Sequence, residues 1–263
     1  MKKEGYIPDS ELIINSDGSA FHIHLRPEQL CDNIIICGDP GRVTMIASHF
    51  DTRDFEVQSR EFHTIGGTYN GKQVMCLSHG IGGDNIDIVM TELDALANVD
   101  FVTRTVKEQH RMLSVIRIGT SGAMTEDLDL FDVVLASGSY SKSSYAKVGF
   151  GYWEDIQLPS EKLNEAIEEA AKKLGKKVTK GLIESGDVFY SDETVNKPSR
   201  YELLCGEMES FGLFATARYC KKNAACLLTI SDHMIKKTVT TAEERQNAFT
   251  DMMEIALNAA ISL

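Results

Sequence analysis

Short runs of β-branched residues alternate with stretches of helical periodicity along this sequence, and this alternation constrains its fold more than any other feature. A run such as Ile34-Ile35-Ile36-Cys37 has the length and composition of a buried strand. Each run is followed within two residues by Gly or Ser, which indicates a turn. The pattern predicts an α/β domain with a mostly parallel sheet and helices on both faces. The other predicted strands lie at residues 74–77, 115–118, 133–135, 182–183 and 224–230.

The predicted sheet is mixed rather than wholly parallel. Asn70-Gly71 lies between two strand-like runs and is typical of a two-residue hairpin turn. No stretch rich in Pro, Gly or Ser divides the chain, so we expect one domain over residues 21–263, preceded by a loosely attached N-terminal arm at residues 1–20. The predicted helices span residues 42–50, 85–98, 160–174 with Gly175 as C-cap, 208–222 and 241–261.

The composition excludes several classes of function. The 27 Lys and Arg residues against 39 Asp and Glu disfavour general nucleic-acid binding, because phosphate neutralisation needs a basic surface. No apolar run approaches the roughly 20 residues of a membrane-spanning helix. The six cysteines contain no Cys-x-x-Cys and several lie in apolar runs, which is typical of reduced thiols and favours a cytoplasmic protein. His22 and His24 have no nearby Cys or carboxylate ligands, so we expect no metal site.

Two arginines follow or lie within predicted strands beside glycine-rich turns. Gly38-Asp39-Pro40-Gly41-Arg42 comes directly after one strand and opens a helix, so backbone N–H groups and a guanidinium are available to one anion. Arg117 lies inside another apolar strand, followed by Gly119-Thr120-Ser121-Gly122. A buried arginine needs a partner anion. The pattern favours a bound phosphate, and an internal Asp or Glu partner for Arg117 is the alternative.

A carboxylate ends the last predicted strand. Ser231-Asp232-His233 follows the apolar run 224–230, and such a position points into the crevice where open α/β sheets bind ligands. Thr241 and Glu244 have the capping-box spacing, which places Arg245 in the first turns of the last helix. We interpret Asp232 and Arg245 as a catalytic acid and its partner. The alternative is an Asp that caps a loop beside a solvated Arg.

Four motifs follow one another along the chain: Gly38-Asp39-Pro40-Gly41-Arg42, Arg117-Ile118-Gly119-Thr120-Ser121-Gly122, Gly206-Glu207-Met208-Glu209-Ser210, and Ser231-Asp232-His233 with Thr241-Ala242-Glu243-Glu244-Arg245-Gln246. In this order they resemble the nucleoside phosphorylase-I family, over about residues 22–260. Within that family the final stretch is most similar to the bacterial-type hexameric purine nucleoside phosphorylases, whereas Glu61-Phe62-His63-Thr64 in the first half is closer to uridine phosphorylases.

The resemblance implies a role for individual residues of this sequence. It implies a homo-oligomer, a hexamer in the bacterial type, whose active sites are shared between subunits, with His22 and Arg60 supplied by the neighbouring chain. Inorganic phosphate is implied as co-substrate, and no cofactor. The implied phosphate ligands are Gly38, Arg42, Arg60, Arg117 and Thr120; the ribose ligands His22, Met208 and Glu209; the base ligands Phe189, Glu207, Ser231 and Asp232; and the catalytic pair Asp232 and Arg245.

The implied reaction is phosphorolysis of purine ribonucleosides or 2′-deoxyribonucleosides to the free base and the pentose 1-phosphate. Cleavage of the N-glycosidic bond develops positive charge on the sugar and negative charge on the base. Phosphate stabilises the first, and Asp232 is expected to protonate the base as general acid, oriented by Arg245.

Three alternatives stay open. A uridine phosphorylase of the same family typically carries a Gln-x-Arg pair shortly after the aromatic that stacks on the base, and Ser191-Asp192-Glu193-Thr194-Val195 contains neither Gln nor Arg, which favours purine. A hydrolytic nucleosidase needs water in place of phosphate, and the arginines argue against it. A protein that binds nucleosides without activity is the alternative from another class.

Overall fold

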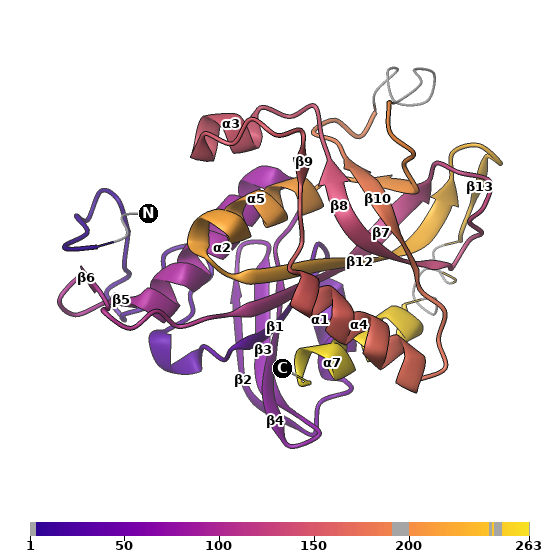
Figure 1. Cartoon of the computed structure of the whole chain (residues 1–263). Coiled ribbons are helices and arrows are strands. Elements are labelled where there is room, and N and C mark those ends of the chain that lie inside the picture. The colour runs from indigo at the N-terminus through magenta and orange to yellow at the C-terminus, as the bar shows by residue number, and fades with distance from the viewer. Residues whose placement is uncertain (1–3, 191–199, 242–243, 245–248, 263) are drawn as a thin grey trace.

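The computed structural model describes residues 4–190, 200–241, 244 and 249–262. These residues form one α/β domain with a large mixed sheet and helices on both faces, as the sequence predicts (Figure 1). The helices are α1 (Pro40–Ala47), α2 (Gly83–Asn98), α3 (Tyr145–Phe150), α4 (Glu161–Lys173), α5 (Ser210–Cys220) and α7 (Thr250–Ala260), preceded by a short 3-10 helix, Pro27–Gln29.

The main sheet contains all six predicted strands. They are β1 (Asn33–Cys37), β4 (Lys72–Ser78), β7 (Ser114–Ala123), β8 (Val133–Tyr140), β10 (Thr179–Ser185) and β12 (Asn223–His233). The hairpin signal at Asn70-Gly71 also predicts β3 (Phe62–Tyr69). The other strands of this sheet, which the sequence does not predict, are β2 (Thr52–Ser59), β9 (Ile156–Gln157), β11 (Cys205–Glu207) and β13 (Thr238–Val239). A separate two-stranded sheet consists of β5 (Val99–Asp100) and β6 (Thr105–Val106).

The strand pairing explains why the sheet is mixed. The predicted strands pair in parallel between β1 and β4, β1 and β7, β8 and β10, and β7 and β12. Antiparallel pairing comes from the hairpin β3–β4, from the edge strand β2, and from the contact of β12 with β8. The hairpin turns at Asn70-Gly71, where both residues have positive φ, 48° and 72°, as a two-residue turn of this type requires.

The pairings of five strands form a closed circuit. β12 pairs with β8, β8 with β10, β10 with β11, β11 with β7, and β7 again with β12. The short strand β11 completes this circuit, and its three residues are too few for sequence periodicity to detect. The circuit brings the carboxyl ends of β7, β10 and β12 together, which no linear strand order would do.

Two hydrophobic clusters cover the two faces of the sheet. Helices α2 and α5 pack on one face through residues such as Ile86, Leu93 and Phe214. Helices α1, α4 and α7 pack on the other through residues such as Ile46 and Ile167. Both faces are therefore buried, which is why the central strands read as continuous apolar runs rather than alternating ones.

The N-terminal arm is not loosely attached, and that expectation is wrong for residues 4–20. Ile7 and Leu12 are buried in a small cluster with Ala95 and Val99. Arg104 also holds the arm, since its Nε donates to the carbonyl of Ile7 at 3.0 Å. Apolar residues spaced irregularly along a loop give no periodic signal, so the sequence does not reveal this packing.

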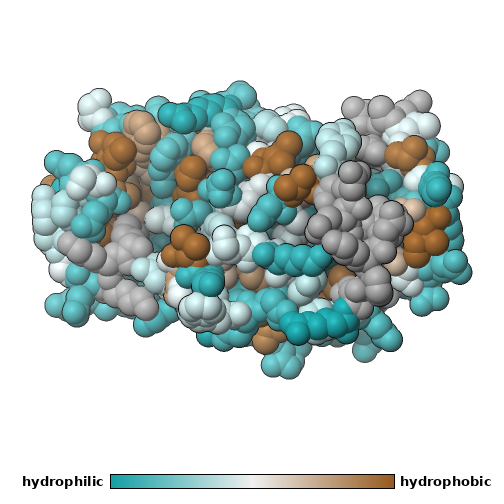
Figure 2. All heavy atoms as spheres, turned by 90° about the horizontal axis from the view of Figure 1, so that it is seen from above, coloured by the Kyte–Doolittle hydropathy of each residue, from teal (hydrophilic) through white to brown (hydrophobic). Residues whose placement is uncertain are grey.

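Several features of the surface and of the thiols bear on the class of protein. All six cysteines are buried and unpaired, and burial raises the pKa of thiols such as Cys37 to about 12, so they pack as small apolar groups. No helix in the described part of the chain is long and apolar enough to cross a membrane. Figure 2 shows a mostly hydrophilic face on which apolar side chains form separate patches.

Candidate functional site

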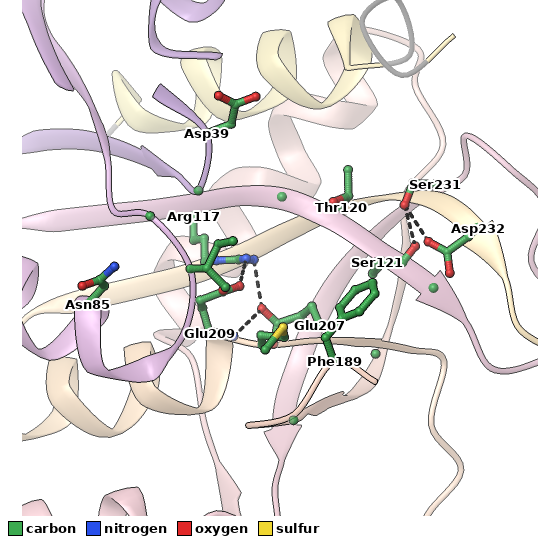
Figure 3. Close-up of a pocket in the computed structure, with 18 of the residues that line it drawn as sticks. Asp39, Asn85, Arg117, Thr120, Ser121, Phe189, Glu207, Glu209, Ser231 and Asp232 are labelled. Carbon is green, nitrogen blue, oxygen red and sulfur yellow. Dashed lines mark hydrogen bonds and ion pairs between the residues drawn. The ribbon is translucent and has the colours of Figure 1, made fainter. Parts of the chain in front are cut away.

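One cavity of about 1110 Å³ opens where the strands end, and most of the predicted site residues line it. Figure 3 shows Arg117 beside Glu207 and Glu209 in one part of the cavity. Ser231 and Asp232 lie together in another part. Residues as far apart in the sequence as Gly38 and Asp232 therefore line the same cavity. The predicted residues that line this cavity are Gly38, Arg42, Arg117, Thr120, Phe189, Glu207, Met208, Glu209, Ser231 and Asp232.

The turn between β1 and α1 presents a helix N-terminus to the cavity. The helix begins at Pro40, two residues earlier than predicted, because Pro is favoured at the first helical position and Asp39 caps the helix by accepting from the N–H of Gly41 at 2.8 Å. A side chain at position 38 would be crowded, since a Cβ would lie 3.1 Å from the carbonyl oxygen of Gly80. The N–H groups of Gly41 and Arg42 donate to Asp39, so the positive end of the α1 dipole and the guanidinium of Arg42 are what make this end of the cavity suitable for an anion.

A histidine also contacts the first residue of α1. His63 is nearly buried on β3, and its ring nitrogens lie 3.1 Å from the carbonyl oxygen of Pro40 and 2.8 Å from a carboxylate oxygen of Glu56. Arg42 stacks its guanidinium on the ring of Phe249, 4.3 Å from the centroid. These contacts fix the turn before any ligand arrives.

Arg117 is buried and carries two internal carboxylate partners. Its Nη1 lies 3.0 Å from Oε2 of Glu207, and its Nη2 donates to Oε2 of Glu209. Burial alone disfavours the guanidinium charge, but the two glutamates outweigh it and raise the pKa of Arg117. The internal partner that the sequence left as an alternative is therefore present. The role of Arg117 as a phosphate ligand stays a prediction, because this group of three side chains carries no excess positive charge when all are ionised.

Both glutamates also hold the backbone around them. Glu207 accepts hydrogen bonds from the N–H groups of Glu209 and Ser210, so it caps α5, which begins at Ser210 rather than at Met208 as predicted. Glu209 accepts from the N–H of Gly82 at 2.7 Å. Burial raises the pKa of Glu209, and Arg117 opposes that shift. The expected contacts of Glu207 with a base and of Glu209 with ribose stay predictions.

Asp232 lies at the carboxyl end of β12, as predicted. A bulge between Ile230 and Asp232 breaks the regular pairing with β7, and the Asp232 side chain is half-buried at the cavity. Ser231 Oγ donates to Asp232 Oδ1 at 2.9 Å, and Thr240 holds the carbonyl of Ser231 through its N–H and its hydroxyl. These contacts orient the carboxylate, and its Oδ2 lies next to Gly122.

The predicted partner of Asp232, Arg245, lies outside the described residues. The capping box that introduces it is present, since Thr241 N–H donates to Glu244 Oε2 at 2.8 Å and Glu244 N–H donates to Thr241 Oγ1 at 3.2 Å. The pairing of Arg245 with Asp232 stays a prediction.

His22 and Arg60 do not line the cavity of their own chain. His22 Nδ1 lies 2.6 Å from Oε1 of Glu92, and the guanidinium of Arg60 stacks on Phe21, 5.7 Å from the ring centroid. Both side chains thus contact Phe21 and are not part of the cavity lining, and their expected contribution to a neighbouring subunit stays a prediction.

The aromatic pair Phe189 and Tyr190 stands at the mouth of the cavity. Phe189 is 73% exposed and Tyr190 is 93% exposed. Their rings are in edge contact, 4.9 Å between centroids. Exposed aromatics at a cavity mouth are available to stack on a planar ligand.

Glu184 and Met234 are among the residues of the cavity wall that sequence reasoning missed. The available signal for Glu184 is its place directly after the predicted strand 182–183, where it ends a strand as Asp232 does. Nothing in the sequence pattern identifies Met234, because its place depends on the bulge in β12.

No metal centre is evident in the described residues. Among residues 4–190, 200–241, 244 and 249–262, no three His, Cys, Asp or Glu side chains come together as a metal site would require.

Comparisons with known proteins agree on one family. The sequence model described as the phosphorylase superfamily matches residues 32–263. A DeoD-type purine nucleoside phosphorylase of Clostridium perfringens is 34% identical over 249 residues, which cover 93% of this chain and 100% of the relative. A protein of the same name from Bacillus subtilis is 32% identical over 240 residues, covering 90% of this chain and 97% of the relative.

A solved structure shares the whole fold. The nucleoside phosphorylase of Trypanosoma brucei, described as showing uridine phosphorylase activity, superposes with a TM-score of 0.87 at 20% sequence identity. The match covers 96% of this chain and 100% of that one. At this identity the likeness establishes the fold.

Proposed function

The chain belongs to the phosphorylase superfamily and is an enzyme of that kind, and we propose that it catalyses the phosphorolysis of purine ribonucleosides or 2′-deoxyribonucleosides. The products are the free purine and the pentose 1-phosphate. The observation that carries this proposal is the cavity itself, which has the N-terminal end of α1 with Arg42 at one end and an oriented carboxylate, Asp232, at the other. Relatives named as DeoD-type purine nucleoside phosphorylases support the choice of base.

The two ends of the cavity match the two charges that develop when an N-glycosidic bond breaks. Phosphate bound at Gly38, Arg42 and Thr120 stabilises the cationic sugar. Asp232 delivers a proton to N7 of the departing purine, with Arg245 as its partner. Arg117 and Glu209 position the ribose and phosphate between these ends, and Met208 lies beneath the sugar.

The active enzyme is proposed to be a homo-oligomer with shared sites, a hexamer in the bacterial type. His22 and Arg60 do not line the cavity of their own chain, which suits residues that complete the site of a neighbour. Inorganic phosphate is the only co-substrate in this proposal, with no metal or organic cofactor. Enzyme dialysed against a chelator is then expected to retain its activity, whereas a monomer in solution is expected to be inactive.

The second candidate is phosphorolysis of uridine. It is favoured by the fold shared with the Trypanosoma brucei protein, which is described as having uridine phosphorylase activity. The absence of Gln and of Arg from residues 191–195 argues for purine.

The deciding experiment measures base release from inosine, adenosine, guanosine and uridine, each with and without inorganic phosphate. We expect release from purine nucleosides that depends on phosphate, with the pentose 1-phosphate as co-product. Release without phosphate would indicate hydrolysis instead. Turnover of uridine alone would establish the second candidate, and nucleoside binding without any turnover would indicate a protein that has lost activity.

Replacing Phe189 with Ala is expected to raise the KM for the nucleoside about 10-fold, because the base loses a stacking partner whose contribution is about 0.5–1.5 kcal/mol. The matched control is Tyr190→Ala, which removes a more exposed ring at the same mouth. Steady-state kinetics at saturating phosphate measures both. Equal effects of the two changes would contradict a specific role for Phe189.

A further inference from the structure

Four directly paired residues form a row across the strands at the base end of the cavity. Asp232 of β12 pairs with Gly122 of β7, Gly122 pairs with Gly206 of β11, and Gly206 pairs with Glu184 of β10. Directly paired residues share a face of the sheet, so two carboxylates flank two glycines. All four line the cavity, and we call them the base row.

The two glycines in the middle of the base row carry no side chains, and the flexible side chains of Met124 and Met234 reach over them. A Cβ on Gly122 would lie 2.6 Å from Oδ2 of Asp232 and 2.8 Å from Cε of Met234. A Cβ on Gly206 would lie 3.4 Å from Sδ of Met124. Three steps of about 4.8 Å between neighbouring strands separate the two carboxylate residues along the row. A planar base bound along this row would have one carboxylate at each of its two edges.

Glu184 differs from the other buried carboxylates of the cavity in having no partner. Within the described part of the chain its carboxylate makes no hydrogen bond and no ion pair, whereas the carboxylates of Glu207 and Glu209 are engaged by Arg117. Glu184 is half-buried; burial raises its pKa, and Lys142 opposes the shift. A partly desolvated carboxylate without a partner is available to a donor on a ligand.

We propose that Glu184 determines which purine the enzyme prefers, by accepting a hydrogen bond from the ring N1–H of a 6-oxopurine while Asp232 contacts the imidazole edge. This inference rests on the proposed phosphorolysis of purine nucleosides. Hypoxanthine and guanine carry a proton on N1, and guanine adds an amino group beside it. Adenine carries a lone pair at N1, which faces a carboxylate unfavourably, since an ionised carboxylate only accepts hydrogen bonds.

The test compares kcat/KM for inosine and adenosine in the wild-type enzyme and in Glu184→Gln. The wild type is expected to prefer inosine by about 10-fold or more, which corresponds to one hydrogen bond to a charged group. In Glu184→Gln this preference is expected to fall by about 10-fold, because an amide donates as readily as it accepts. Glu184→Ala, which removes the acceptor altogether, is expected to lose the preference too. Retained turnover of adenosine reports that each variant is folded.

The matched control is Glu165→Gln, the same chemical change on the exposed face of α4, which is expected to leave the ratio unchanged. An unchanged ratio in both Glu184 variants, or a wild type that prefers adenosine, would overturn the inference while leaving purine phosphorolysis intact. A wild type that releases no purine from any nucleoside would overturn the proposed function and this inference with it. The two failures are therefore distinguishable.

Discussion

Replacing Asp232 with Asn is expected to lower kcat for purine nucleoside phosphorolysis by about 10²- to 10⁴-fold, the contribution of a positioned general acid. Asn has the same shape and keeps the hydrogen bond with Ser231, but it has no proton to transfer to the base. Because Asp232 is half-buried and has no ion pair among the described residues, we expect little change in the free energy of unfolding. Single-turnover kinetics with inosine and saturating phosphate isolates the chemical step.

The control for Asp232 is Asp54→Asn, which makes the same change on the exposed edge strand β2. It is expected to have wild-type kinetics. Nucleosides whose departing base needs no protonation offer a second check, since their cleavage should be nearly insensitive to Asp232→Asn. Wild-type turnover of inosine by the Asp232→Asn enzyme would remove Asp232 from the mechanism.

Replacing Arg117 with Met is expected to lower the free energy of unfolding by about 3–5 kcal/mol, because it leaves buried carboxylates without their cation. Arg117 is 4% exposed, and Glu207 and Glu209 are almost as deeply buried. Methionine fills much of the space but supplies no donor. Urea denaturation at fixed protein concentration measures the change, and phosphorolysis is expected to be lost as well.

The matched control is Arg218→Met on α5, where an exposed arginine lies 3.5 Å from Glu154. An exposed ion pair contributes about 0–1 kcal/mol, so the same substitution should have little effect there. Adding Glu209→Gln to Arg117→Met is expected to restore part of the lost stability, because one unpaired charge is removed. Equal effects at positions 117 and 218 would show that the buried group of three is not needed for folding.

Much of the fold follows from local sequence pattern. The strands at residues 34–37 and 115–118 are apolar because both sheet faces are covered, and the hairpin at Asn70-Gly71 follows from the positive φ that those residues tolerate. Helix ends were less predictable. α5 begins at Ser210 rather than at Met208 because the Glu207 carboxylate caps it, and that contact depends on tertiary structure as well as on spacing.

The sequence by itself determined that this is an α/β domain, that a glycine-rich turn with Arg42 follows the first strand, and that Asp232 ends the last one, since these are local properties of strands, turns and helix starts. Only the tertiary structure decided what Arg117 pairs with and that Glu184 stands opposite Asp232 across two glycines. The physical reason is that both results depend on residues far apart in the chain. They follow from the closed circuit of strands and the short strand β11, neither of which leaves a periodic trace in the sequence.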